Sequence, residues 1–167
     1  KIVWPNPTPI AFGNPITDTQ LNASVLDGIP GTFSYGSNPS GTYYQAGNLR
    51  LYTVFTPTDL TRYNVVVGQT FFGVGRDWVD VSYATPAPIR FGQVFLGQDL
   101  KLRAVGRNYT GFIAGSFQLV GVNTRLSIGN ANIRVRFIPV DKRNFSMAII
   151  DIPVTVLPKI NPTMVWN

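Results

Sequence analysis

The side chains that most often perform chemistry in proteins are largely missing from this sequence. Histidine and cysteine do not occur, and the eight acidic residues are all aspartates. Serine and cysteine nucleophiles usually need a neighbouring histidine as base, so the common forms of nucleophilic catalysis are excluded. The aspartates are scattered, mostly at turns, and do not suggest the carboxylate pair of a glycoside hydrolase. The sequence therefore predicts that the chain is not an enzyme.

Two aspartates are candidates for binding a cation. Asp77 and Asp80 lie on either side of Trp78, and carboxylate oxygens are ligands that Ca²⁺ prefers. No Asp-x-Asp or Asp-x-Asn run accompanies them, so a capped turn with solvated carboxylates is the favoured interpretation. The sequence predicts no cofactor and no metal site, with Asp77 and Asp80 as the weak candidates for calcium.

Positively charged side chains form the second group with binding potential. The net charge is +6, and residues 77–158 carry nine basic and five acidic side chains against four and three in residues 1–76. If the strands around 101–103 and 134–136 belong to one sheet, its solvent face carries a patch of four cations: Lys101, Arg103, Arg134 and Arg136. Such a patch would bind an acidic polysaccharide or another anionic ligand.

The favoured interpretation of this patch is nevertheless a solvated face that keeps sheets from pairing edge to edge. Nucleic acid is the least favoured ligand, because the charge excess is small and no reading motif is present.

Aromatic side chains offer a third surface. Tyr43-Tyr44 and Phe71-Phe72 are adjacent pairs, and neighbouring residues of a strand point to opposite faces, so we expect one ring of each pair to be exposed. Exposed rings could stack on sugars. Packing against a neighbouring module or beneath a loop is the favoured interpretation.

The elements that hold these residues are short strands. Apolar and polar residues alternate in Ile133–Phe137 and in Leu100–Ala104, which is the period of a half-buried strand. The same period predicts inward rows at Leu49, Leu51, Thr53 and Phe55, and at Ile150, Ile152, Val154 and Val156. Turn residues separate these runs, and no segment has a sustained helical period. The pattern is typical of an all-β sandwich.

An internal repeat predicts the domain organisation. Pro9–Gly13 returns 79 positions later as Pro88–Gly92, and the pair Pro57 and Asp59 returns 82 positions later as Pro139 and Asp141. We therefore expect one repeat at 1–76, a second at 77–158, and the start of a third at 159–167. Val74–Asp77 are expected to form a short linker.

Aromatic residues recur at equivalent positions of the repeats. Trp4, Tyr83 and Trp166 each stand at the entry to a repeat and are predicted to cap a sandwich end or the junction with a neighbouring module. A second aromatic, Tyr63 or Phe145, follows each Pro-x-Asp turn by four residues. We expect these two rings to return the chain to the core.

The signatures of the first repeat belong to a recognisable family. They are Val3-Trp4, Pro9–Gly13, Thr19–Ala23, Pro30–Tyr35, Ala46-Gly47 and Phe55–Tyr63. With these residues the repeat resembles, over nearly its whole length, the bacterial Ig-like repeats found in tandem in large surface and secreted proteins. The second repeat departs more, since Ile138–Asp141 replaces the usual Thr-Pro-Thr-Asp stretch. The resemblance implies two tandem immunoglobulin-like β-sandwiches, a spacer, adhesion or decoration role, and no catalytic residues.

The favoured function is a structural or adhesion module of a stiff extracellular stalk, filament or lattice on a bacterial cell surface. Its expected partners are neighbouring Ig-like modules of the same protein, together with polysaccharide or other surface components. One alternative is a decoration module of a phage capsid or tail, on the virion surface, with weak binding to host glycans. The other alternative is a carbohydrate-binding module attached to a secreted enzyme. No apolar stretch reaches the length of a membrane helix, so membrane insertion is not expected.

Overall fold

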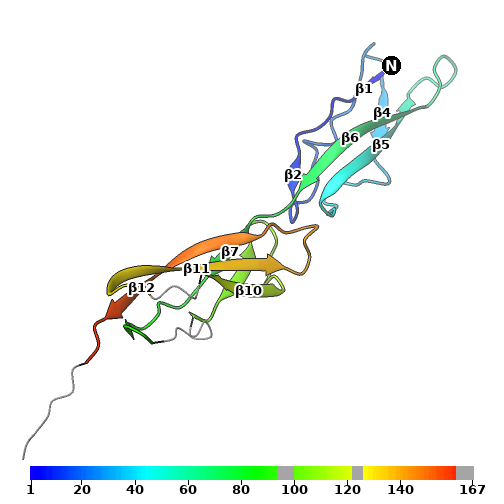
Figure 1. Cartoon of the computed structure of the whole chain (residues 1–167). Helices are drawn as coiled ribbons and strands as arrows, with labels where there is room; N and C mark the ends of the chain where they lie inside the picture. Colours follow the sequence, from blue (N-terminus) through cyan, green and yellow to red (C-terminus); the bar gives the residue numbers. More distant parts are fainter. Residues whose placement is uncertain (94–99, 122–125, 161–167) are drawn as a thin grey trace, which may run out of the picture. The chain divides into compact units, whose positions relative to one another are not determined.

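The computed structural model describes residues 1–93, 100–121 and 126–160 of the 167-residue chain. The described part is all-β and divides into two compact units (Figure 1). Unit 1 comprises Lys1–Asp77, Arg107–Thr110 and Arg143–Phe145, and unit 2 comprises the other described residues. Unit 1 thus takes in two short segments of the second repeat. Most of the predicted third repeat, including Trp166, lies outside the described residues.

Unit 1 consists of two sheets. The small sheet pairs β1 (Ile2–Val3) with β3 (Ser24–Val25) in antiparallel fashion. The large sheet has the order β2-β6-β5-β4. Its strands are β2 (Ile10–Ala11), β4 (Gly31–Ser34), β5 (Gly47–Pro57) and β6 (Val66–Gly75). All its pairs are antiparallel except β2 with β6, which is parallel.

Unit 2 repeats this arrangement. Its small sheet pairs β7 (Val79–Ser82) with β9 (Arg103–Gly106). Its large sheet has the order β10-β11-β12-β8. The strands of that sheet are β8 (Ile89–Arg90), β10 (Gly115–Val120), β11 (Gly129–Pro139) and β12 (Ala148–Leu157). Each unit is therefore an immunoglobulin-like β-sandwich, as the sequence predicts.

The long hairpins form because apolar residues occupy every second position of their strands. On β5 the side chains of Leu51, Thr53 and Phe55 are buried, while Tyr52 and Val54 between them are exposed. The inward rows predicted for β5, β11 and β12 are all buried or half-buried. The core of unit 1 is built from Trp4, Ile16, Leu21, Leu51, Phe72 and Val74. The core of unit 2 is built from Leu100, Ile133, Val135, Ile152 and Val154.

Equivalent strands of the two repeats pair in the same register. The parallel pair of unit 1 places Ile10 opposite Val74, and the parallel pair of unit 2 places Ile89 opposite Val156. These partners are the same residues that the 79- and 82-residue offsets relate in the sequence. The internal repeat is thus a repeat of backbone pairing as well as of residue type.

One loop of the second repeat is longer than its counterpart in the first. Strand pairing shows which positions of the two repeats are equivalent. Val25 corresponds to Ala104, because they pair with Ile2 and Val81. Gly31 corresponds to Gly115, because they pair with Pro57 and Pro139. Eleven positions separate Ala104 from Gly115, against six between Val25 and Gly31, so the second repeat has five extra residues here. The extra length falls in the β9–β10 loop, which contains the segment Arg107–Thr110 of unit 1.

The segment between the last strand of unit 1 and the start of unit 2 is shorter than the predicted linker Val74–Asp77. Val74 and Gly75 are the last residues of β6, and Val74 is buried in the core of unit 1. Arg76 and Asp77 alone separate this core strand from unit 2, which begins at Trp78.

Candidate functional site

The two weak candidates for a cation site, Asp77 and Asp80, lie in different surroundings. Asp77 is fully buried in unit 1, whereas Asp80 is an exposed residue of β7 in unit 2. The carboxylate of Asp77 accepts hydrogen bonds from protein N–H groups, described below. In residues 1–93, 100–121 and 126–160, no three acidic side chains come together as a metal-ion cluster.

The predicted basic patch does not lie on one sheet. Arg103 belongs to β9, which pairs with β7, whereas Arg134 and Arg136 belong to β11 of the four-stranded sheet. Lys101 lies outside any strand, at φ 45°, a left-handed backbone that ends the alternation before β9 begins. The condition for a single four-cation face, that the two strands belong to one sheet, is not met, because the short strand Arg103–Gly106 pairs with β7 in the small sheet.

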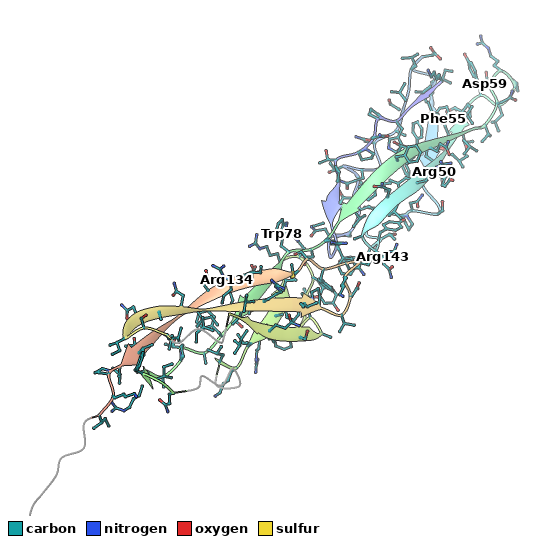
Figure 2. All side chains as sticks on the ribbon, viewed as in Figure 1. Arg50, Phe55, Asp59, Trp78, Arg134 and Arg143 are labelled. Atoms are coloured by element: carbon teal, nitrogen blue, oxygen red, sulfur yellow. The ribbon has the colours of Figure 1, made fainter. Side chains whose placement is uncertain are left out.

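Two of the four cations are also engaged by their own neighbours. The guanidinium of Arg134, which is labelled in Figure 2, donates to both carboxylate oxygens of Asp151, at 2.8 and 2.9 Å. These hydrogen bonds raise the pKa of Arg134 and lower the pKa of Asp151. Arg103 lies over the ring of Phe112, 5.2 Å from its centroid. A patch of four free cations is therefore not present at these positions.

The aromatic residues at the entry of each repeat differ in burial. Trp4 is only 8% exposed, packs edge-on against Tyr35, and donates a hydrogen bond from Nε1 to the carbonyl of Gln20 at 3.0 Å. Tyr83, the equivalent residue, is 40% exposed. Trp4 is thus a core residue of unit 1, and Tyr83 does not share that role. The third member, Trp166, lies outside the described residues.

The buried carboxylate of Asp77 accepts several hydrogen bonds within unit 1. Oδ2 accepts hydrogen bonds from the backbone amides of Asn108 at 3.0 Å and Tyr109 at 2.9 Å. Oδ1 accepts one from the side-chain amide of Asn108 at 2.7 Å. A buried charge is costly unless hydrogen bonds compensate it, and charged acceptors form the stronger bonds. Asp77 therefore holds the β9–β10 loop segment in unit 1.

A second segment is held beside it. The backbone amide of Asp77 donates to the carbonyl of Asn144 at 2.8 Å, and the side-chain oxygen of Asn144 accepts from the amide of Ala46 at 2.8 Å. Arg143 donates from Nε to the carbonyl of Ala46 at 3.0 Å. We call the residues Asp77, Asn108, Tyr109 and Asn144 the Asp77 network. Through Asn144 the network also contacts Ala46, which lies 98 positions earlier in the sequence.

Three aromatic rings pack beside the Asp77 network. Phe12 stacks on Tyr109 at a centroid distance of 5.7 Å, and Phe145 meets both rings edge-on at 5.3 Å. Gly13 follows Phe12 at φ 96°, and a Cβ there would lie 2.5 Å from the backbone nitrogen of Tyr109. Only glycine allows the β9–β10 loop to approach so closely. This aromatic cluster supplies apolar contact next to the buried carboxylate.

Sequence reasoning missed the Asp77 network. Asp77 was considered only as a metal ligand or as a turn cap, and Asn108 and Asn144 were not singled out. The available signal was the growth of the repeat offset, which shows that the second repeat carries extra residues. Phe145 is buried, but it lies in unit 1 and not in the core of its own repeat. Tyr63, its equivalent, is 37% exposed. The expectation that these rings return each chain segment to the core of its repeat was therefore wrong for Phe145.

A different surface of unit 1 carries exposed rings. On the outward side of the β5–β6 hairpin, Arg50 lies opposite Phe71 and Tyr52 opposite Gln69. The guanidinium of Arg50 is 4.9 Å from the centroid of the Phe71 ring, and Phe71 is 57% exposed while Phe72 is buried. The expectation of one exposed ring in this pair is confirmed. We call this surface the β5–β6 outer face, made of Arg50, Tyr52, Val54, Val67, Gln69 and Phe71.

The described residues 1–93, 100–121 and 126–160 contain no helix that could span a membrane.

The fold and the Asp77 network define a pair of immunoglobulin-like β-sandwich modules, the first of which incorporates segments of the second repeat. No protein-family model matches the chain, and no characterised protein matches it either. Among solved structures, it is similar to the fibronectin(III)-like modules of Clostridium thermocellum CbhA, with 14% identity over 93% of this chain and 95% of that chain, and a TM-score of 0.30. This likeness carries no implication for function.

Proposed function

We propose that the chain is a non-catalytic structural module of an extracellular stalk or surface filament built from tandem immunoglobulin-like repeats. The observation that carries this proposal is the Asp77 network, in which residues of the second repeat complete the first unit. In an array that bears mechanical load, contacts with the neighbouring repeat increase the resistance of each repeat to unfolding. Modules that fold independently of one another would not require a buried, hydrogen-bonded carboxylate at this position.

The chemistry of the network suits this role. Each hydrogen bond to a charged acceptor contributes about 1.5–3 kcal/mol, and Asp77 accepts from two backbone amides and one side-chain amide. Because these donors come from the β9–β10 loop, unfolding of the second repeat would withdraw them from unit 1. The stability of the two repeats is then coupled, as it is between neighbouring repeats of a solenoid.

The partners in this proposal are neighbouring Ig-like modules of the same protein, and the location is a bacterial cell surface. The proposed role involves no cofactor, and the Asp77 oxygens accept protein N–H groups. The coupling is tested by unfolding the chain in urea with separate probes for the two repeats. Coincident transitions in the wild type that separate in Asp77→Ala support the proposal, and transitions that are already separate in the wild type contradict it.

The location is tested with an antibody raised against this chain and immunogold labelling of the native source. Gold along the cell envelope, or on filaments that leave it, supports the proposal. Gold confined to virus particles would reassign the chain to a virion module, and gold restricted to a secreted enzyme complex would reassign it to an accessory module of that enzyme.

A second candidate function, glycan binding, is favoured by the β5–β6 outer face. Its exposed rings, Tyr52 and Phe71, are accompanied by a guanidinium and an amide from Arg50 and Gln69. Aromatic faces with planar polar partners can stack on sugar rings and hydrogen-bond their hydroxyl or carboxylate groups. This binding would serve either a virion decoration or a carbohydrate-binding module.

Retention on immobilised polysaccharides tests this second candidate. Phe71→Ala should abolish retention that the wild type shows, whereas Tyr43→Ala, which removes an exposed ring elsewhere on unit 1, should leave it unchanged. Equal retention of both variants would exclude the β5–β6 outer face as the binding surface.

A further inference from the structure

The outer face of the β11–β12 hairpin in unit 2 is the counterpart of the β5–β6 outer face, and its chemistry differs. An offset of 82 residues relates three cross-strand pairs of one hairpin to three of the other. The pair Arg50 and Phe71 corresponds to Asn132 and Pro153, Tyr52 and Gln69 to Arg134 and Asp151, and Val54 and Val67 to Arg136 and Ile149. The same fold thus accommodates an ion pair and no aromatic ring at these positions. Exposed aromatic rings that the fold does not require indicate an interaction surface.

Arg50 is held on the β5–β6 outer face by two neighbours. Its guanidinium carbon lies 4.9 Å from the centroid of the Phe71 ring, and Nη1 donates to the side-chain oxygen of Gln69 at 3.5 Å. A guanidinium has five N–H donors in a planar fork, and the described residues accept from one of them here. Because the ring and the amide orient the guanidinium, its remaining donors are arranged in advance for a planar anion such as a carboxylate.

The β5–β6 outer face is positively charged. Arg50 carries the only formal charge among its six residues, and the outward residues of the adjacent strand β4, Thr32 and Ser34, are uncharged. An anionic ligand is therefore attracted to this face. A second copy of the chain is disfavoured, because its net charge is +6 and it would place another Arg50 at the contact.

The size of the face suits a short stretch of a polymer. It has six residues, whereas a stable protein–protein interface uses about 20–30 residues on each side. Along β5 the backbone rises about 13 Å from Arg50 to Val54, which is enough for a short oligosaccharide segment. Tyr52 stands between these two residues on the same side of the strand and is 43% exposed.

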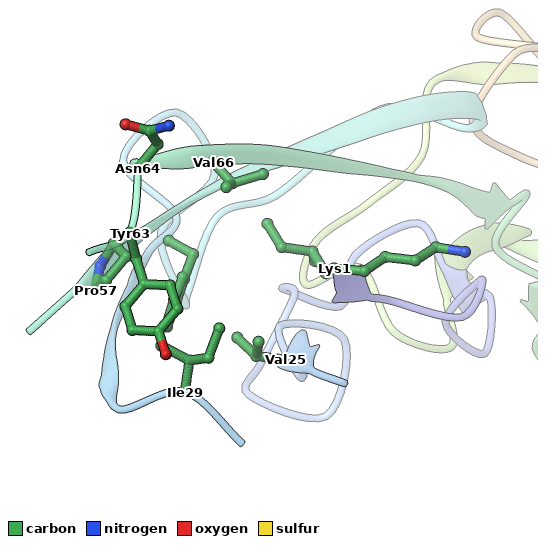
Figure 3. Close-up of a pocket in the computed structure, with 9 residues that line it drawn as sticks. Lys1, Val25, Ile29, Pro57, Tyr63, Asn64 and Val66 are labelled. Atoms are coloured by element: carbon green, nitrogen blue, oxygen red, sulfur yellow. The ribbon is translucent and has the colours of Figure 1, made fainter. Parts of the chain in front are cut away.

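An apolar cavity elsewhere in unit 1 does not offer these features. Its volume is about 150 Å³, and its walls include Val25, Ile29 and Val66, which Figure 3 shows together with Tyr63. Sites for small molecules have volumes of about 300–1,000 Å³, so this cavity is too small for a sugar chain. No arginine is among its described lining residues. The β5–β6 outer face therefore fits a charged glycan better.

We propose that the β5–β6 outer face binds polysaccharides that contain uronic acids. The carboxylate of one sugar accepts hydrogen bonds from the guanidinium fork of Arg50, and a neighbouring sugar ring packs against Tyr52. Phe71 supports the guanidinium from below and acts as a positioning residue. The proposal rests on the second candidate function, glycan binding, and names the class of glycan.

Affinity electrophoresis of the full chain compares polygalacturonate with the same polymer after methyl esterification. The two polymers share their sugar rings and differ in the free carboxylate. We expect the wild type to bind polygalacturonate at least about tenfold more tightly than the methyl ester, since hydrogen bonds between charged groups are the stronger ones. Equal binding of both polymers would overturn the proposal. If that binding is also lost in Phe71→Ala, glycan binding at this face still stands.

Variants matched in charge separate recognition by Arg50 from general attraction of a polyanion to a basic protein. Arg50→Gln and Arg62→Gln each remove one arginine of unit 1, but Arg62 lies over the ring of Tyr63 and not on the β5–β6 outer face. We expect Arg50→Gln to bind polygalacturonate about tenfold more weakly. Arg62→Gln should stay within about twofold of the wild type. Arg50→Lys keeps the charge without the planar fork and should bind with intermediate affinity.

Two further outcomes would overturn the proposal. One is an equal loss of binding in Arg50→Gln and Arg62→Gln, which would mean that net charge alone attracts the polymer. The other is a wild type that binds neither polymer, which would also remove glycan binding from this face. Urea unfolding of the same samples tests the structural role independently, because coupled transitions in a chain that binds no glycan would leave the Asp77 network and the stalk proposal intact.

Discussion

Asp77 and Asn108 are joined by hydrogen bonds from both the backbone and the side-chain amide of Asn108 to one carboxylate. The pair lies 31 positions apart in the sequence, and it brings a loop of the second repeat into the compact unit of the first. Bidentate contacts of this kind fix a loop in orientation as well as in position. The stability of unit 1 therefore depends on residues that the repeat boundaries assign to its neighbour.

Removal of the Asp77 carboxylate should destabilise the chain strongly. Asp77→Ala removes the acceptor of the part-buried amides of Asn108 and Tyr109, so we expect a loss of about 3 kcal/mol in the free energy of unfolding. Asp18→Ala, which removes an exposed carboxylate of the same unit, should change stability by less than about 0.5 kcal/mol. Urea denaturation measures both, and equal effects of the two substitutions would contradict the role assigned to Asp77.

The entry aromatics should respond differently to truncation. Trp4→Ala removes a core ring and its hydrogen bond to Gln20, which should cost about 4 kcal/mol. Tyr83→Ala removes a ring that is 40% exposed and should cost less than about 1 kcal/mol. Thermal and urea unfolding compare the two variants. A similar loss in both would indicate the shared role that the sequence suggested.

Gly13 should be less tolerant of a side chain than a glycine in open space. Gly13 and Gly41 both have positive φ, at 96° and 91°, so an alanine at either position costs about 1–2 kcal/mol of backbone strain. Gly13→Ala also places a methyl group against the Tyr109 backbone, whereas no atom lies within 4 Å at Gly41. We expect Gly13→Ala to lose about 2 kcal/mol more than Gly41→Ala in urea unfolding. Equal losses would mean that the loop does not approach Gly13.

The ion pair on β11 and β12 should make stability depend on pH in the acid range. Hydrogen bonds from Arg134 lower the pKa of Asp151 below its ordinary value of 3.8. A depressed folded-state pKa contributes stability above the unfolded-state pKa, and that contribution is lost as the pH falls through the folded-state value. The stability difference between wild type and Asp151→Asn should therefore be fully present above about pH 4 and should shrink progressively as the pH falls below that value. A stability difference that is independent of pH would contradict this assignment.

The fold was largely predictable because burial on one face imposes a period of two on the sequence. Ile133, Val135 and Phe137 alternate with polar residues and all three are buried, and the 79-residue offset between Ile10 and Ile89 is matched by their strand pairing. These signals are local or repeat at fixed spacing, so a single sequence contains them.

The contacts between distant segments were not predictable in the same way. Lys101 and Arg103 alternate with apolar residues like a strand of a large sheet, but the choice of strand partner depends on pairing with β7, which no local pattern specifies. Asp77 lies between β6 and β7, and its donors lie 31 and 32 positions away. A hydrogen bond between residues so far apart produces no periodic pattern in the sequence from which it could be predicted.

Amide hydrogen exchange at Asn108 and Tyr109 tests the central claim most directly. If these residues belong to unit 1, their amides should be protected by the hydrogen bonds to Asp77 and should exchange at least about 100-fold more slowly than exposed loop amides. Asp77→Ala should remove this protection while the amides of β5 and β6 stay protected. Exchange of Asn108 and Tyr109 at the rate of an unstructured loop in the wild type, with β5 and β6 protected, would show that the loop does not belong to unit 1.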